Sequence, residues 1–123
     1  MGQQSSAICY IEIPAPNLDR TGEFYSAVFG WKVTPSNLSD KPYWMFQTGE
    51  GQLEGGFDPS RSVKTDGGVI LYLKVNNIDQ ALTDVSNAGG KIARAKFEIG
   101  GGYGYSALIN DPNGNEIGLL CEK

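Results

Sequence analysis

Apolar and polar residues alternate along residues 7–13, which predicts a β-strand. Ile11 and Ile13 fall on one face of this strand, and Tyr10 and Glu12 fall on the other. A strand with this pattern packs its aliphatic face on a core. Its second face then has to be covered by a ligand, by another part of the chain or by a second chain.

The apolar residues that follow recur every three or four positions, which is the spacing of an amphipathic helix. Asn17 is a favourable N-cap for this helix, and Gly30 is a favourable C-terminal stop. Short stretches bounded by turn residues then predict three strands, at about 31–34, 43–48 and 52–57. The order is strand, helix and three strands.

The same order returns later in the chain. Asn17-Leu18-Asp19 corresponds to Asn77-Ile78-Asp79 (77 − 17 = 60), and Gly30 corresponds to Gly90 at the same offset. The second copy predicts strands at about 91–99, 103–110 and 116–122. A repeat of this length indicates two copies of one supersecondary unit, each too small to bury a core alone.

We therefore predict a single α+β domain over residues 1–123, made of two βαβββ units whose curled mixed sheets surround a shared trough. The first unit spans 7–57, and the second spans 69–122. The polar, glycine-containing residues 58–68 link them. A seam between two such units is a natural place for a pocket.

Composition narrows the choice of partners. The chain has 14 acidic and 10 basic residues and a net charge of −4, which argues against nucleic acid binding. No apolar run approaches the ~20 residues that cross a bilayer, so we expect no membrane contact.

The cysteines and the lack of histidine limit the chemistry of the chain. The first residues do not resemble a secretory signal, and Cys9 and Cys121 fall on helix-facing positions, so we expect buried, reduced thiols in a cytoplasmic protein. The chain contains no histidine, which excludes Ser-His-Asp and Cys-His catalytic arrangements.

Three segments point to a known family: Ile11-Glu12-Ile13-Pro14, Phe24-Tyr25-Ser26-Ala27-Val28-Phe29-Gly30-Trp31 and the turn Asp111-Pro112-Asn113-Gly114-Asn115, of which the last two are fairly specific together. They resemble glyoxalase-like proteins of the vicinal oxygen chelate superfamily, which also contains bleomycin-resistance proteins and extradiol dioxygenases. The resemblance extends over about residues 7–121 and implies the two-unit fold. It also implies a homodimer, because many members of the superfamily are dimers.

Enzymes of that superfamily chelate a divalent metal with side chains, usually histidine or glutamate, from the first and last strands of each unit. The resemblance maps these positions onto Tyr10, Ile70, Gly118 and a residue near Gly55. Transition-metal sites need three or four converging nitrogen, sulfur or oxygen donors, which these residues do not supply. We therefore expect the fold and the trough, but no metal and no other cofactor.

The residues predicted to contact a ligand are mostly aromatic, with a few polar handles. They are Tyr10, Glu12, Trp44, Phe46, Phe57, Ile70, Tyr72, Tyr103, Tyr105 and Gly118. The alternative is that several of the aromatic residues only fill the core. The sequence does not assign which face of the strands at 43–48 and 103–110 lines the trough. The glycine-rich segment 100–104 is either a flap over the trough or a plain hairpin loop.

The preferred function is binding or sequestration of a small, partly apolar organic molecule, without a metal. One alternative is a metal-independent lyase or isomerase in which Glu12 or a tyrosine is the acid or base. The competing interpretation of Glu12 is a strand-end carboxylate paired with Lys74 or an arginine. A further alternative is a protein-interaction paralogue with no small-molecule role. Whether a trough is formed within one chain or between two stays open.

Overall fold

The computed structural model describes residues 8–38, 41–49 and 53–122. The first unit contains β1 (Tyr10–Pro14), α1 (Leu18–Phe29), β2 (Lys32–Thr34), β3 (Asn37–Leu38), β4 (Lys41–Pro42), β5 (Trp44–Thr48) and β6 (Leu53–Asp58). The second contains β7 (Leu71–Lys74), α2 (Ile78–Asn87), β8 (Lys91–Glu98), β9 (Tyr105–Asn110) and β10 (Glu116–Cys121).

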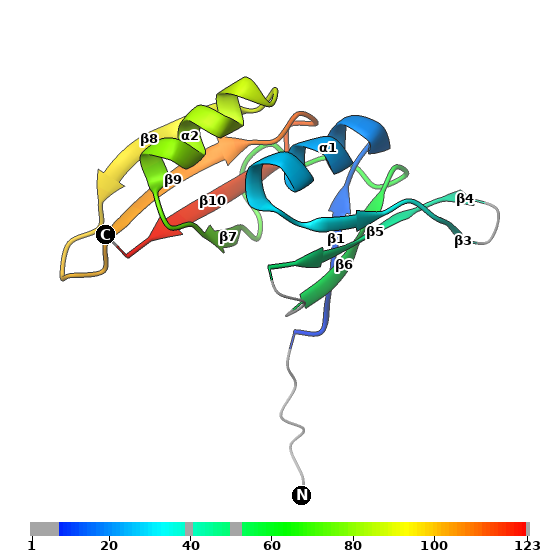
Figure 1. The fold of residues 1–123 in the computed structure, drawn as a ribbon, viewed down its shortest axis with the longest axis horizontal. Coiled ribbons are helices and arrows are strands. Elements are labelled where there is room, and N and C mark those ends of the chain that lie inside the picture. Colours follow the sequence, from blue (N-terminus) through cyan, green and yellow to red (C-terminus); the bar gives the residue numbers. More distant parts are fainter. Residues whose placement is uncertain (1–7, 39–40, 50–52, 123) are drawn as a thin grey trace, which may run out of the picture.

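Each unit builds a four-stranded mixed sheet with the same topology. The strand orders are β1-β6-β5-β2 and β7-β10-β9-β8. The pairs β1–β6 and β7–β10 are parallel, and the other neighbours are antiparallel. The two sheets lie side by side, and α1 and α2 lie next to each other on the same side of them (Figure 1). The α+β class and the two βαβββ units predicted from the repeat are confirmed.

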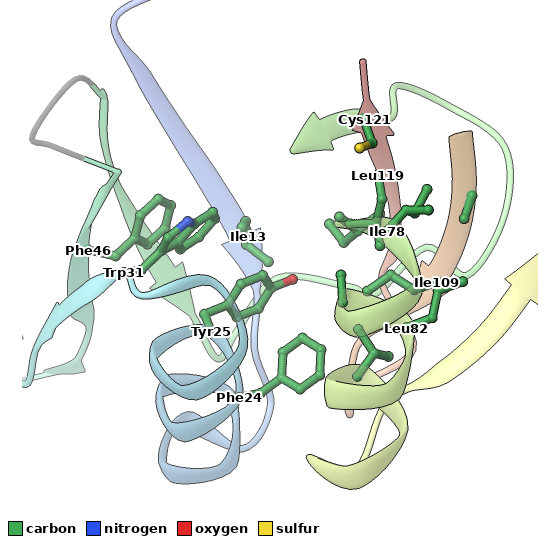
Figure 2. Packing of buried hydrophobic residues seen from close by; sticks show 14 of the residues in the cluster. Ile13, Phe24, Tyr25, Trp31, Phe46, Ile78, Leu82, Ile109, Leu119 and Cys121 are labelled. Atoms are coloured by element: carbon green, nitrogen blue, oxygen red, sulfur yellow. The ribbon is translucent and has the colours of Figure 1, made fainter. Parts of the chain in front are cut away.

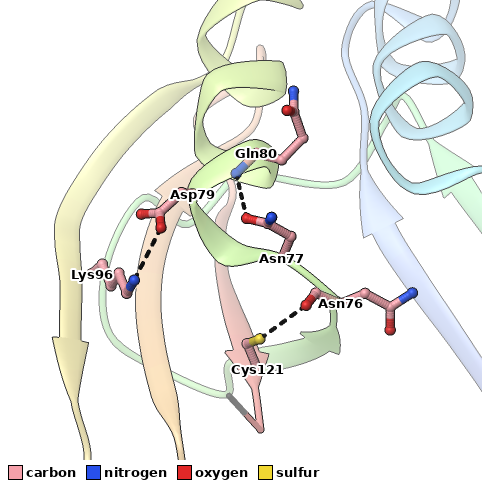
Figure 3. Close-up of polar contacts among 6 residues, drawn as sticks. All are labelled: Asn76, Asn77, Asp79, Gln80, Lys96 and Cys121. Carbon is pink, nitrogen blue, oxygen red and sulfur yellow. Dashed lines mark hydrogen bonds and ion pairs between the residues drawn. The ribbon is translucent and has the colours of Figure 1, made fainter.

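Asparagine caps begin both helices, as predicted. Asn17 Oδ1 accepts a 3.0 Å hydrogen bond from the Arg20 backbone N–H, and Asn77 Oδ1 accepts one of 2.9 Å from the Gln80 N–H (Figure 3). Gly30 ends α1 with φ 72°, a left-handed conformation that costs glycine nothing.

The observed elements differ from the prediction in several places. The start of the predicted strand at 7–13 lies outside the described residues, and β1 begins at Tyr10. The strand predicted at 103–110 begins at Tyr105, because the glycine-rich segment closes a loop through the Ile99 N–H to Gly104 carbonyl hydrogen bond of 2.9 Å. The short β3–β4 hairpin was not predicted. Cys9 is exposed and not buried as expected, because it precedes the strand.

The hydrophobic core is continuous across both units. Phe24 and Tyr25 of α1 face Ile78 and Leu82 of α2 (Figure 2). Tyr25 stacks on Trp31 with ring centroids 4.7 Å apart. Burying side chains of this size stabilises the fold by ~1.5–3 kcal/mol each, so neither unit keeps a complete core without the other.

A turn of the second unit also holds the first. Tyr25 Oη donates a buried 2.9 Å hydrogen bond to Asp111 Oδ2, and Asn115 Nδ2 donates one of 2.7 Å to the Pro14 carbonyl. The units therefore join through their helices and this turn, which leaves the opposite faces of the two sheets outside the core. No helix in the described part of the chain is long and apolar enough to cross a membrane.

Candidate functional site

Strand register defines the face of the first sheet that points away from α1. Residues opposite each other on neighbouring strands point to the same side of a sheet. Tyr10 lies opposite Glu54, and Glu12 lies opposite Gly56, which in turn lies opposite Met45. We call this the outer face of the first sheet. Tyr10 is 45% exposed and Met45 is 38% exposed, so apolar surface is open there.

The second sheet has an equivalent outer face. Tyr72 lies opposite Gly118, and Gly118 lies opposite Leu108. Lys74 and Leu120, also opposite each other, belong to the same face. Tyr72 is 51% exposed and Leu120 is 37% exposed.

Three of the predicted ligand-contacting residues lie on the helix-facing side of the first sheet. Phe57 is fully buried and Phe46 is 2% exposed, and both belong to the core. Trp44 lies opposite Phe57, and its ring packs so closely on α1 that a Cβ atom on Gly22 would lie 3.1 Å from Trp44 Cζ3. The sequence left open which face of β5 carries Trp44 and Phe46, and the structure places both on the helix-facing side.

The two later tyrosines are also separated from the outer faces. Tyr105 lies opposite the buried Cys121, on the helix-facing side of its sheet. Lys96 Nζ lies 4.6 Å from the Tyr105 ring centroid and 3.0 Å from Asp79 Oδ2 of α2 (Figure 3). Tyr103 is in the loop before β9 and is 73% exposed.

The predicted set thus divides into groups. The outer faces carry Tyr10, Glu12, Tyr72 and Gly118. The helix-facing side carries Trp44, Phe46, Phe57 and Tyr105, while Ile70 immediately precedes β7 and Tyr103 is in a loop.

The register also specifies the position that the sequence placed only near Gly55. Gly118 lies opposite Tyr72, and the equivalent residue of the first unit is the one opposite Glu12 (72 − 12 = 60), which is Gly56. Gly55 is directed toward the helix side, where an added Cβ would collide with the Phe46 ring. The fourth position, which the sequence placed near Gly55, is therefore assigned to Gly56.

A tyrosine ring lies over each of these outer-face glycines. A Cβ atom on Gly56 would overlap the ring and hydroxyl of Tyr43, and one on Gly118 would overlap the ring of Tyr72. Neither position has room for a chelating side chain unless a tyrosine moves. The two units have reached the same local arrangement with tyrosines from different places in the sequence.

Tyr43 connects Glu12 with Tyr10. Tyr43 Oη donates to Glu12 Oε2 at 2.9 Å, and the hydroxyls of Tyr10 and Tyr43 are also 2.9 Å apart. Burial, together with the hydrogen bonds to Tyr10 and Glu12, raises the pKa of Tyr43 above its usual value. Glu12 is not paired with Lys74, whose ammonium lies 3.5 Å from Glu122.

Sequence reasoning did not find Tyr43. Its position immediately before β5, on the alternate parity to the core residues Trp44 and Phe46, was the signal that could have placed it on the outer face. The contact with Glu12 itself spans 31 positions and depends on the sheet register.

The residues at the superfamily's metal positions do not suit a metal ion. Tyr10, Ile70, Gly56 and Gly118 offer one phenol and no carboxylate, imidazole or thiolate. Among the described residues, no group of three or more Asp, Glu, Cys or His side chains is placed to hold an ion. The lack of a metal centre stays a prediction.

Two hollows accompany these surfaces. A small one of about 190 Å³ is lined by the outer-face residues Tyr10, Lys32, Thr34, Met45, Gln47 and Glu54, and also by Phe46 and Gly55. A larger cleft of about 760 Å³ lies between the two units. Its apolar wall includes Ile11, Val28, Phe29, Trp31, Phe46, Leu53, Leu71, Leu73 and Val75, and Ile70 and Tyr72 also border it.

Comparison with known proteins agrees with this fold. The profile of the Glyoxalase/Bleomycin resistance protein/Dioxygenase superfamily matches residues 7–119. A glyoxylase-like domain-containing protein of Didymella fabae is 27% identical over 111 residues, which cover 85% of each chain.

Two solved structures are similar to this chain in fold. The fosfomycin resistance protein FosX of Listeria monocytogenes has a TM-score of 0.78 and 15% identity, over 96% of this chain and 94% of its own. TnmS3, an antibiotic binding protein from Streptomyces sp. CB03234, has a TM-score of 0.70 and 16% identity, over 97% and 98%. With its repeated βαβββ units and a profile match along most of its length, the chain belongs to the glyoxalase/bleomycin resistance protein/dioxygenase superfamily.

Proposed function

We propose that this protein binds and sequesters a small, partly apolar organic molecule on the outer faces of its sheets, without a metal ion. The observation that carries the proposal is that the rings of Tyr43 and Tyr72 lie over Gly56 and Gly118. Phenol rings at these positions offer apolar contact and single hydrogen bonds in place of metal ligands.

The surface chemistry supports a ligand of mixed character. The outer faces expose Tyr10, Met45, Tyr72 and Leu120 beside the carboxylates of Glu12 and Glu54. Binding sites for small molecules combine apolar walls with a few polar groups in this way. TnmS3, the antibiotic binding protein described above, shares the fold, which supports sequestration of a small organic compound as the role of this scaffold.

We further propose that the trough forms between two copies of the chain. In one copy the outer faces belong to separate sheets that are joined through their helices. The outer face of the first sheet carries Glu12 and Glu54, and that of the second carries Arg94, opposite Leu108, so that a carboxylate of one copy can meet the guanidinium of another.

Arg94 adds a specific reason for a partner on the second sheet. Its guanidinium lies 4.0 Å from the Phe97 ring centroid, and Nη2 donates to Ser106 Oγ at 2.8 Å. These two contacts hold the guanidinium on the outer face of the second sheet, where it can meet a carboxylate of another copy.

The experiment combines molecular mass with ligand-induced stabilisation. Light scattering should give the mass of a dimer. Thermal unfolding in the presence of a panel of flat aromatic amines should show a rise of several degrees for a tight ligand, which mass spectrometry recovers unchanged. Tyr72→Ala should abolish the rise, whereas Tyr103→Ala in the exposed loop should not. No stabilisation by any compound, or its full retention in Tyr72→Ala, would contradict the proposal.

One observation favours a second candidate, a metal-independent lyase or isomerase. Glu12 accepts a hydrogen bond from Tyr43, and Tyr43 is in turn hydrogen-bonded to Tyr10. A carboxylate is therefore linked to a phenol at the surface of the site, as acid–base chemistry would need. In an enzyme of this kind, Glu12→Gln would abolish turnover of a bound compound. In the sequestering protein, the compound is recovered unchanged from the wild type and from the variant.

A further inference from the structure

We propose that Tyr10, Tyr43 and Glu12 form a one-way hydrogen-bond chain that makes the outer face of the first sheet select ligands with hydrogen-bond donors, above all primary ammonium groups. This inference rests on the proposed function, because it specifies the ligand chemistry of the same site.

The direction of the chain follows from the number of protons. A phenol hydroxyl has one proton, and a carboxylate has none. Tyr43 Oη uses its one proton in the 2.9 Å hydrogen bond that it donates to Glu12 Oε2. The 2.9 Å contact between the two hydroxyls therefore has Tyr10 as its donor and Tyr43 as its acceptor. Tyr10 Oη is left with lone pairs alone to offer a ligand, which must then supply the proton.

The surrounding charges favour the same ligand class. Glu54 and Asp58 lie two residues on either side of Gly56 on β6, and so on the same face as Glu12. Hydrogen bonds from Ser60 hold the pKa of Asp58 below its usual value, which keeps this group charged at neutral pH. Lys32 also borders the hollow and is exposed. Arg61 interacts with Asp58, so three carboxylates are accompanied by two cationic side chains, and the remaining negative charge attracts a cationic ligand.

Gly56 keeps the chain in place. The Tyr43 ring crosses the strand at this position, and any larger side chain there would displace the phenol from Glu12. The small hollow of about 190 Å³ beside Tyr10 is bordered by Met45, which offers apolar contact to the ring or alkyl part of a ligand.

The test uses two probes that share one aromatic system. 2-Naphthylmethylamine is protonated at neutral pH and presents an ammonium donor, and 2-acetonaphthone presents a ketone acceptor. Their dissociation constants are measured by calorimetry with the purified protein. The wild type should bind the amine at least about tenfold more tightly, since hydrogen bonds to charged groups are worth ~1.5–3 kcal/mol.

Two variants test the direction of the chain. In Glu12→Gln the amide can donate to Tyr43, which then donates to Tyr10, so that Tyr10 donates outward. In Tyr43→Phe the Tyr10 proton loses its acceptor and is also free to point outward, while the charge of Glu12 is kept. Both variants should bind 2-acetonaphthone about fivefold more tightly than the wild type, and a second substitution, Tyr10→Phe, should remove that gain. Tyr103→Phe is the matched control and should change neither constant.

The outcomes separate the two proposals. If neither probe binds, the inference is overturned, and the compound panel described above decides the proposed function. If the wild type binds both probes but prefers the ketone, or if neither variant gains affinity for it, the inference is overturned and sequestration stands. A measurement without ligand decides the direction independently. The hydroxyl proton of Tyr43 should show an NMR contact with the Glu12 side chain, and a contact with Tyr10 in its place would overturn the one-way chain.

Discussion

The phenol ring of Tyr43 lies over Gly56, so that a side chain at position 56 would overlap it. The same relationship holds in the second unit, where the ring of Tyr72 lies over Gly118. Two of the four positions that the resemblance maps as metal ligands, Gly56 and Gly118, therefore lie beneath aromatic rings.

Neighbouring glycines on β6 should respond differently to alanine. An added methyl at Gly55 meets the backbone oxygen of Ile11 and the buried Phe46 ring, neither of which can move away easily. At Gly56 it meets the Tyr43 side chain, which borders solvent and can move. We expect Gly55→Ala to lower the free energy of unfolding by about 1–3 kcal/mol and Gly56→Ala to lower it by less. Urea unfolding measures both, and a larger loss in Gly56→Ala would contradict the assigned faces.

Alkaline pH should unfold the protein through Tyr25. Burial first, and then the neighbouring Asp111, raises the pKa of Tyr25 well above its usual value of 10.0. The unfolded chain therefore releases this proton at a lower pH than the folded one. The stabilisation is complete below about pH 10 and is lost as the pH rises above that value.

The variant Tyr25→Phe checks this assignment. It should be less stable than the wild type at pH 7, because Asp111 loses a 2.9 Å hydrogen bond. Its free energy of unfolding should then fall less steeply between about pH 10 and 11.5 than that of the wild type. Equal slopes in the two proteins would show that Tyr25 does not control alkaline unfolding.

The turn that joins the units should be important for stability. Asn115 is 6% exposed and donates to the Pro14 carbonyl at 2.7 Å and to Asp111 at 2.9 Å. We expect Asn115→Ala to cost about 1–3 kcal/mol, because buried acceptors lose their donor. Asn76 has an exposed side chain (Figure 3). The variant Asn76→Ala is therefore the control and should leave the thermal midpoint nearly unchanged. Similar midpoints for the two variants would contradict the role of the turn.

The sequence predicted most of the fold because its signals are local and repeated. Asn17 and Asn77 cap their helices where the sixty-residue offset (77 − 17 = 60) places them, and strand alternation correctly put Tyr10 and Glu12 opposite the core. Local spacing of this kind depends on residues a few positions apart, which the sequence shows directly.

The site was harder to predict because it depends on register. Phe46 and Phe57 suit a core as well as a pocket, and only the pairing of β5 with β6 shows that they face the helices. A shift of one residue exchanges the two faces of a strand, which is why the sequence placed this position only near Gly55, while the register assigns it to Gly56. Tyr43 reaches Glu12 across the sheet, a contact that no local pattern contains.

A charge on the second outer face should dissociate the proposed dimer. Leu120 is 37% exposed on that face, and Leu120→Glu would bury an unpaired carboxylate in the interface. We expect light scattering to give a monomer for this variant and a dimer for the wild type. Ser86→Glu adds the same charge at an exposed position of α2, and this variant should stay dimeric. A dimer in both variants would show that the outer faces do not form the interface.

The metal content of the protein tests the central claim most directly. The purified protein is incubated with zinc, manganese and iron(II) salts, freed of unbound ions and measured by elemental analysis, alongside Tyr10→Phe and Glu12→Gln. Because Tyr10, Ile70, Gly56 and Gly118 supply too few donors, we predict far less than one ion per chain and no difference among the three proteins. One tightly held ion per chain that is lost in Tyr10→Phe or Glu12→Gln would contradict a metal-free site.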